Sequence, residues 1–421
     1  MFKTLRDAWG IPELRKKLMF TVIALLIYRL VAAIPVPFVN TELMSTYFDA
    51  NLQGSILGFY DMMNGSALSN ARVLALGIQP YINASIIIQL LSVAIPALER
   101  MAKEEGEAGK KKINTITRYA TVGLGLLLGF AYYTMIKSTG ILTDAGSKGM
   151  AAAVIILVFT AGSSFAMWVG EQITEHGVGN GISMILFANI VAGLPGMAGR
   201  MGDMGVLGAV IVAVVLLALV VFIVFINDAE RRIPINYAKR VVGRKVYGGQ
   251  NTNLPIKVAM SGVMPVIFAQ SICSIPATIC AFTGSTTGWW YENVWSNTSW
   301  TYLIIYGLMI FFFSWFYAQI QYDPVEIGNN LKKNGGFIPG FRPGKPTADF
   351  IAKVISKIII FGAVYLAIVS MMPMLGGKIN ENITGLAIGG TSIIIVVGVA
   401  LETVKAIEAQ MLMRHYKGFL D

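Results

Sequence analysis

Side chains suited to covalent or metal chemistry are scarce in this sequence, which has two Cys and two His in 421 residues. Cys273 and Cys280 lie in one apolar run, at a spacing that places two small buried side chains on one helical face. His176 and His415 have no neighbours at metal-ligand spacing. No P-loop, Gly-x-Ser-x-Gly or His-Glu-x-x-His motif occurs. The sequence therefore predicts no catalytic residue, metal site or cofactor, which argues against an enzyme.

Ionisable residues are also rare where an ion-coupled transporter needs them, deep in its membrane spans. Arg29 lies inside an apolar run, and Glu171 and Glu402 lie near the ends of others. A snorkelling or capping role suits each of them as well as a transport role. This pattern leaves open a secondary transporter of a small neutral solute, which needs no such charges.

Composition points to a membrane protein, because 55% of the residues are apolar and 13% are charged, against about 25% charged in soluble domains. A helix needs about 20 apolar residues to cross a bilayer. Ten segments are candidate spans: residues 18–36, 74–97, 120–136, 151–169, 182–194, 206–226, 258–282, 303–317, 358–374 and 386–401. Pro80, Pro265 and Pro276 fall inside these runs, so neighbouring protein or water must satisfy freed backbone groups. We predict an all-α polytopic bundle with a polar interior.

The positive charges are distributed unevenly along the chain. With ten spans, 27 of the 33 Lys and Arg residues fall on the side that holds both termini, and five fall on the other. The first side comprises residues 1–17, the loop around 100–118, the loops at about 228–257 and 319–357, and the tail 402–421. The positive-inside rule places these segments in the cytoplasm. The first apolar run lacks a small-residue cleavage motif, so we expect it to be a retained helix rather than a signal peptide.

One segment, residues 54–71, is too polar to cross lipid alone. It contains Gly58, Gly65, Ser66 and Ser69. Irregular backbone at membrane depth is tolerated only inside protein or along a cavity. The segment is therefore either an extracytoplasmic loop or an insertion into the bundle.

Several ordered motifs resemble those of the SecY/Sec61-alpha family of protein-conducting channels. They are residues 65–69 (GSALS), 75–91 (ALGIQPYINASIIIQLL), 167–175 (MWVGEQITE), 177–183 (GVGNGIS), 236–240 (NYAKR), 330–333 (NLKK) and 339–344 (PGFRPG). The resemblance extends from the first predicted helix to the tenth.

This resemblance implies two pseudo-symmetric halves, residues 18–195 and 206–401, around a central hourglass pore, with residues 54–71 as a plug. It implies the channel subunit of a bacterial translocase in the cytoplasmic (inner) membrane, which passes unfolded preproteins across and releases transmembrane segments sideways. The implied partners are small SecE and SecG membrane subunits, the SecA ATPase, the ribosome, signal peptides and membrane lipids. No cofactor is implied.

The family's pore is closed by a ring of aliphatic side chains. The matching positions are Ile78, Ile82, Ile182, Leu186, Ile267 and Ile395. Such a collar blocks ions by dewetting. Without the resemblance, each of these residues would be read as a lipid-facing or core side chain. Leu186 stands where the family often has Ile, a change that conserves volume.

Two other parts of the family's channel have matches. In the plug, Gly65 and Ser66 replace two adjacent glycines. In the lateral gate, Asn83 and Gln89 match polar positions whose interhelical hydrogen bonds hold the gate closed, although ordinary polar packing is an equal alternative. Ala259 replaces a family Asn, so part of that network is expected to be absent.

The basic cytoplasmic loops have two interpretations. By charge alone they determine topology next to anionic lipid. By resemblance they dock the ribosome and SecA through Arg244, Lys245, Lys332, Lys333 and Arg342. Pro and Gly residues flank Arg342 and stiffen the tip that carries it.

Overall fold

The structure is a computed structural model that describes residues 2–51, 56–103, 105–143, 149–203, 205–237, 240–242, 245–247, 251–259, 262–283, 289–296, 299–379 and 389–417. Helices dominate it. The first half holds α1 (Phe2–Trp9), α2 (Pro12–Val31), α3 (Thr41–Asn51), α4 (Ile56–Met63), α5 (Gln79–Ala94), α6 (Pro96–Lys103), α7 (Gly106–Ser138), α8 (Gly149–His176) and α9 (Gly181–Asp203). The second half holds α10 (Gly205–Asp228), α11 (Met264–Thr283), the π-helix η2 (Tyr291–Trp295), α12 (Trp300–Gln321), α13 (Pro324–Lys333), α14 (Lys345–Ile379) and α16 (Gly389–Lys417).

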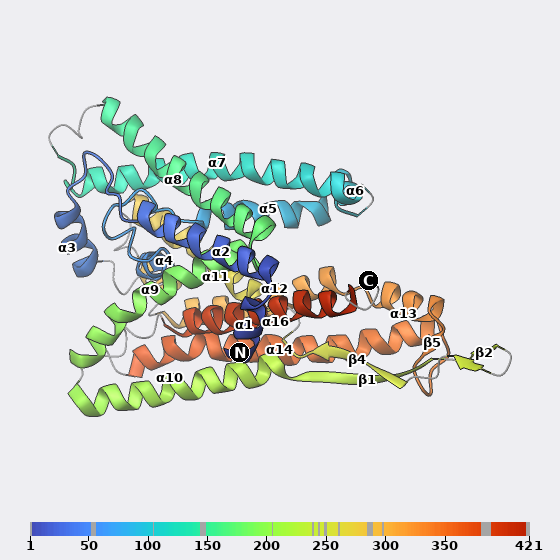
Figure 1. The fold of residues 1–421 in the computed structure, drawn as a ribbon. Coiled ribbons are helices and arrows are strands. Elements are labelled where there is room, and N and C mark those ends of the chain that lie inside the picture. The colour runs from blue at the N-terminus through green and yellow to red at the C-terminus, as the bar shows by residue number, and fades with distance from the viewer. Residues whose placement is uncertain are drawn as a thin grey trace.

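The two halves of the chain lie on opposite sides of the molecule. Figure 1 shows α2, α5, α7 and α8, in blue to green, facing α10, α14 and α16, in yellow-green to red, with α9 and α11 between the two groups. Helix α11 contacts α4 and α5, and α16 contacts α9. One continuous apolar core runs through both groups.

The surface of the bundle is that of a membrane protein. Within the described residues, five helices are long and apolar enough to cross a bilayer: Gly106–Ser138, Gly149–His176, Val210–Asp228, Trp300–Lys333 and Lys345–Met372. Each of the ten predicted segments overlaps a helix. Helix α10 leaves Leu217 68% and Phe225 70% exposed, as expected of side chains that face lipid.

The second predicted span, residues 74–97, is shorter than expected. Helix α5 begins at Gln79 because Pro80 stands in its first turn, where the missing N–H would have no helical partner anyway. The preceding residues form turns with positive φ at Gly65, Ser66, Ala71 and Gly77. Pro80 therefore starts a helix, whereas Pro276 lies inside α11 as predicted.

The helical fold class is as predicted, and the two large basic loops add short strands to it. The strands β1 (Glu230–Tyr237), β4 (Asn251–Lys257) and β5 (Gly336–Phe337) form an antiparallel sheet in the order β4-β1-β5. The hairpin of β2 (Arg240–Val242) and β3 (Lys245–Tyr247) extends from it. Ile233 and Ile235 are buried between exposed neighbours, the alternation of a half-buried strand. Pro234 on β1 and Pro255 on β4 hide this signal in the sequence.

Candidate functional site

Aliphatic side chains from the start of α5 and from α9 meet at Gly170 on α8. Ile78 precedes α5 and is fully buried, with Ile82 one turn further along. A Cβ built on Gly170 would lie 3.4 Å from Ile78 Cδ1 and 3.7 Å from Ile182 Cγ1. Ile78 from the start of α5 and Ile182 from α9 therefore both pack at the same point on α8.

Polar contacts fix the start of α9, which carries Ile182 and Leu186. Asn180 Oδ1 accepts hydrogen bonds from the backbone N–H of Ile182 (3.0 Å) and Ser183 (3.3 Å), as an N-terminal cap. Thr174 Oγ1 accepts from the Gly181 N–H at 2.9 Å and donates to the Gly170 carbonyl at 2.9 Å. The direction of α9 is thus tied to α8.

The second half contributes Ile267 from α11 and Ile395 from α16. Both line a narrow crevice together with Met63 of α4, and the crevice leaves no room for a water molecule. Ile267 is 5% exposed, and Ile395 and Met63 are each 1% exposed. Five of the predicted collar residues belong to one buried cluster: Ile78, Ile82, Leu186, Ile267 and Ile395. Ile182, the sixth, packs against this cluster.

The predicted plug, apart from residues 54 and 55, which lie outside the described residues, consists of α4 and a compact turn. Asp61, 8% exposed, accepts the Ser69 N–H at 2.8 Å. Gly65 has a φ of +64°, which favours glycine, and a Cβ there would lie 2.3 Å from Arg29 Nη1, so a larger residue would displace the guanidinium. Ser66 also has positive φ, and Gly58 is half-buried in α4.

Asp61 and Arg29 are contact residues of the predicted plug that the sequence motifs did not single out. Arg29 Nη1 donates to Asn189 Oδ1 of α9 at 3.4 Å, so the guanidinium lies between the plug turn and that helix. The available signal was their charge, since each is an ionisable residue in a nearly neutral segment.

Asp61→Ala should loosen the turn of residues 64–71. A buried N–H without a partner costs about 1–3 kcal/mol, so hydrogen exchange at the Ser69 amide should accelerate roughly 5- to 150-fold. Asp61→Asn keeps an acceptor oxygen and should leave exchange near the wild-type rate. Equal acceleration in both variants would contradict a role for this hydrogen bond.

The same carboxyl should make the plug sensitive to pH. Burial raises the pKa of Asp61, which lies in a helix too short to span the membrane. A carboxyl whose pKa is higher in the folded state stabilises that state as pH falls through the folded pKa, and this stabilisation is lost as pH rises. The pH dependence of local stability should disappear in Asp61→Asn.

The predicted gate residues lie on α5, in different surroundings. Asn83 borders a cavity of about 350 Å³ between α4, α5, α7 and α11. Its Oδ1 atom is buried without a partner in the described structure, as are Asn64 Oδ1 and Gln79 Oε1 in the same cavity wall. Gln89 is exposed. Closure of the lateral gate by hydrogen bonds of Asn83 and Gln89 stays a prediction.

The predicted docking residues that the structure describes lie outside the helical bundle, in or beside the two basic loops. Arg342 is exposed in a turn bounded by Gly340 (φ +88°) and Gly344 (φ +105°). Its carbonyl accepts from Thr347 Oγ1 at 2.8 Å, so the backbone of the turn is held while the guanidinium is exposed. Lys332 and Lys333 are exposed at the end of α13, Lys245 belongs to β3, and Arg244 lies outside the described residues.

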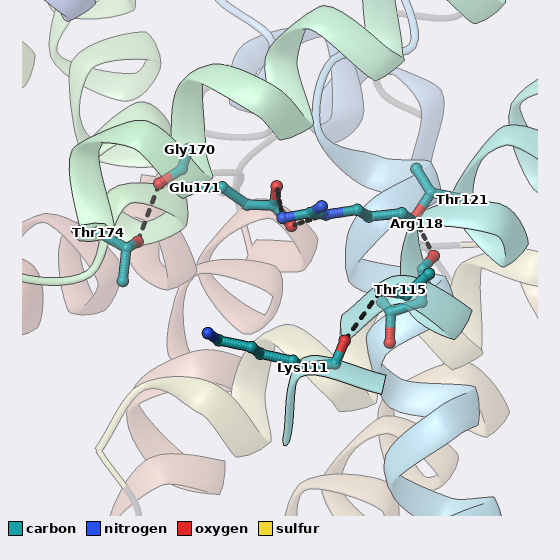
Figure 2. A network of polar contacts seen from close by, with 8 residues as sticks. Lys111, Thr115, Arg118, Thr121, Gly170, Glu171 and Thr174 are labelled. Atoms are coloured by element: carbon teal, nitrogen blue, oxygen red, sulfur yellow. Dashed lines mark hydrogen bonds and ion pairs between the residues drawn. The ribbon is translucent and has the colours of Figure 1, made fainter. Parts of the chain in front are cut away.

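A charged cavity of about 650 Å³ lies between α7, α8 and the start of α9, and reaches Tyr81 and Ile182. An ion pair closes its wall, with Arg118 Nε 3.0 Å from Glu171 Oε1 and Arg118 Nη2 3.0 Å from Glu171 Oε2. Figure 2 shows the two side chains extended toward each other from α7 and α8. Ile182 of the predicted collar therefore adjoins a polar, accessible space.

Comparison with known proteins gives the family. The family model described as SecY matches residues 72–404. The chain belongs to the SecY family. The protein translocase subunit SecY of Thermotoga maritima is 41% identical over 436 residues, covering 100% of this chain and 98% of that protein. The SecY subunit of Streptomyces lividans is 41% identical over 440 residues, covering 100% of both.

Solved structures of SecY relatives share the fold. A structure described as a protein conducting channel superimposes with a TM-score of 0.65 at 16% identity, over 97% of each chain. Sec61 in the canine ribosome-channel complex superimposes with a TM-score of 0.60 at 15% identity, also over 97% of each chain. The expected family and helical channel fold are confirmed, and a SecY family chain with these apolar helices is a multi-pass membrane protein.

Proposed function

We propose that this chain is the protein-conducting channel subunit of a bacterial translocase in the cytoplasmic membrane. It would pass unfolded secretory proteins across the membrane and release transmembrane segments sideways into lipid. The observation that carries the proposal is the identity of 41% to translocase subunits over the full chain. The buried aliphatic side chains from both halves of the molecule support it.

In this proposal the collar seals the resting pore. Ile78 and Ile182 close one side at Gly170, while Ile267 and Ile395 close on Met63 of the plug. A dry aliphatic constriction excludes ions, and it offers a passing polypeptide no hydrogen bond that must be broken. Opening requires α4 to leave the crevice, which frees Met63 from the Gln79 side-chain amide 3.9 Å away.

The sideways exit would lie between α5 and α11. The cavity there is lined mainly by apolar side chains, including Ile87 on α5 and Ile275 on α11, and the plug closes one end of it. An apolar segment of a passing chain could bury itself there before it reaches lipid. In the closed gate, Asn83 and Gln89 would form interhelical hydrogen bonds, and an entering apolar segment would displace them.

Docking partners would meet the basic loops. Phosphate groups of ribosomal RNA attract Lys and Arg, so ribosome binding should weaken as salt rises. Sec61 has been solved in a ribosome-channel complex, which supports the same partner here. The SecA ATPase, as the alternative motor, would use the same loops, and SecE and SecG would pack on the lipid-facing helices.

The orientation proposed is cytoplasmic for both termini and for the basic loops. In a variant lacking Cys273 and Cys280, a cysteine replacing Lys333 should react only from the cytoplasmic face. A cysteine replacing Lys137, exposed at the far end of α7, should react only from outside.

The decisive experiment reconstitutes the chain with SecE and SecG in vesicles. With SecA and ATP, an unfolded preprotein should become protected from protease added outside, and the same protein without its signal sequence should not. A secondary transporter of a small neutral solute would instead show saturable solute uptake without SecA. Absence of protected preprotein, together with such uptake, would replace the channel proposal with the transporter.

A further inference from the structure

The ion pair between Arg118 and Glu171 has a defined geometry. Two parallel N–H groups of the guanidinium face both carboxylate oxygens at 3.0 Å. A fork of this kind fixes orientation as well as distance, which a single contact does not. Glu107, on the same cavity wall, lies 3.9 Å from Lys110, so the fork is a separate contact.

The pair completes the interface between α7 and α8. Further along these helices the contact depends on glycine: a Cβ at Gly125 would lie 3.0 Å from Ser163 Oγ, and one at Gly129 would lie 3.3 Å from the Ile156 carbonyl. Such close backbone packing sets the separation of two helices and leaves their relative rotation to side chains. Arg118 and Glu171 supply that constraint at the cytoplasmic end.

Rotation of α8 matters because Glu171 directly follows Gly170. Ile78, Ile182 and Ile185 converge on Gly170: a Cβ built on this glycine would lie 3.4 to 3.7 Å from one side-chain carbon of each. A Cβ built on Gly181 would lie 1.9 Å from the Gly170 carbonyl, so α9 follows α8 closely. A turn of α8 would therefore separate the two isoleucines that close this side of the collar.

We infer that the Arg118–Glu171 fork positions the collar, by fixing the rotation of α8 so that Gly170 stays against Ile78 and Ile182. Both residues are positioning residues, since neither touches a translocating chain in this role. The inference rests on the proposed function, because the collar seals only if the protein is a channel.

The exposure of this ion pair distinguishes a role in positioning the collar from a contribution to global stability. The side chain of Arg118 is 52% exposed and that of Glu171 is 18% exposed. Ion pairs this exposed contribute little to global stability. Loss of the fork should therefore change the closure of the collar while leaving the thermal unfolding temperature unchanged.

The test measures resting ion current through the reconstituted channel in planar bilayers. Arg118→Lys keeps the charge but loses the fork, and Glu171→Gln keeps the shape but loses the charge. Each should raise resting current roughly 1.4- to fivefold, the shift expected when a partly exposed ion pair is lost. The exchanged pair, Arg118→Glu with Glu171→Arg, should return the current toward the wild-type value.

Lys112→Gln is the matched control. It removes a positive charge from the same helix and breaks a contact of 2.8 Å with Glu105, in a pair whose side chains are 60% and 39% exposed. Its resting current should equal that of wild type. If this control leaks as much as the fork variants, the effect is one of charge alone and the inference is wrong.

Further outcomes are distinct. Wild-type current in both fork variants overturns the inference, and so does a lowered unfolding temperature with no change in current. The variant Ile82→Asn with Ile182→Asn separates this failure from that of the proposed function. If the asparagine variant leaks and the fork variants do not, only the inference fails, whereas tight closure in all of them removes the collar itself.

Discussion

Ile82→Asn combined with Ile182→Asn should make the resting channel leak ions. Ile82 is 4% exposed and Ile182 packs against the same buried cluster. A buried amide without a partner costs roughly 1–3 kcal/mol, so water should enter with two such groups and the dewetted barrier should be lost. Resting current should rise by about tenfold or more, since about 1.4 kcal/mol corresponds to a factor of ten.

Two controls define this result. Ile82→Val with Ile182→Val keeps an aliphatic surface and should stay closed, with at most a small increase in current. Leu217→Asn places the same amide on α10, where Leu217 is 68% exposed, and should leave the current unchanged. A leak of equal size from Leu217→Asn would mean that polar substitution disturbs the bundle in general.

Arg342→Glu should abolish most translocation while the protein still assembles. The guanidinium is exposed in a turn whose backbone is held by the Thr347 hydroxyl and by packing of the Phe341 and Phe350 rings, with centroids 4.2 Å apart. The substitution replaces a donor fork with a carboxylate that repels phosphate or acidic partners. Preprotein protection in vesicles should fall by about tenfold or more, as expected when a charged contact at an interface is reversed.

Lys345→Glu is the matched control, since it reverses an exposed charge three residues away, at the first residue of α14. It should retain most translocation, and Arg342→Lys should fall between the two. Orientation, read from cysteines at Lys333 and Lys137, should be the same in all variants because the remaining loop cations still hold the loop inside. Full activity of Arg342→Glu would leave these cations as topology determinants only.

Local patterns in the sequence predicted the helices but not how they meet. Ile78 and Ile82 share a helix face by spacing alone, yet the contact of Ile78 with Gly170 joins segments about 90 residues apart. Arg118 and Glu171 are separated by 53 positions, and neither motif nor periodicity connects them. Pro80 signalled an interrupted helix, but only the geometry of the preceding turns places it at the start of α5.

Strand pairing was the other element that sequence reasoning missed. The register of β1 with β5, Asn236 to Phe337 and Tyr237 to Gly336, joins loops about 100 residues apart. Strands β1 and β4 pair over seven residues within one loop, whereas the pairing of β1 with β5 joins two distant loops and therefore depends on tertiary contact. Gly336 permits it, since a Cβ there would lie 3.1 Å from Tyr237 Cε1.

This sheet has a mechanical consequence. Strand β1 continues from α10, and the loop of β5 and Arg342 leads into α14, so both attachments belong to the second half of the molecule. A force that a partner applies to either loop would therefore act on α10 and α14 at the same time. Force applied to these loops would tilt the second half as a unit against the first, and the movement would reach the contacts of α11 with α5 and of α16 with α9.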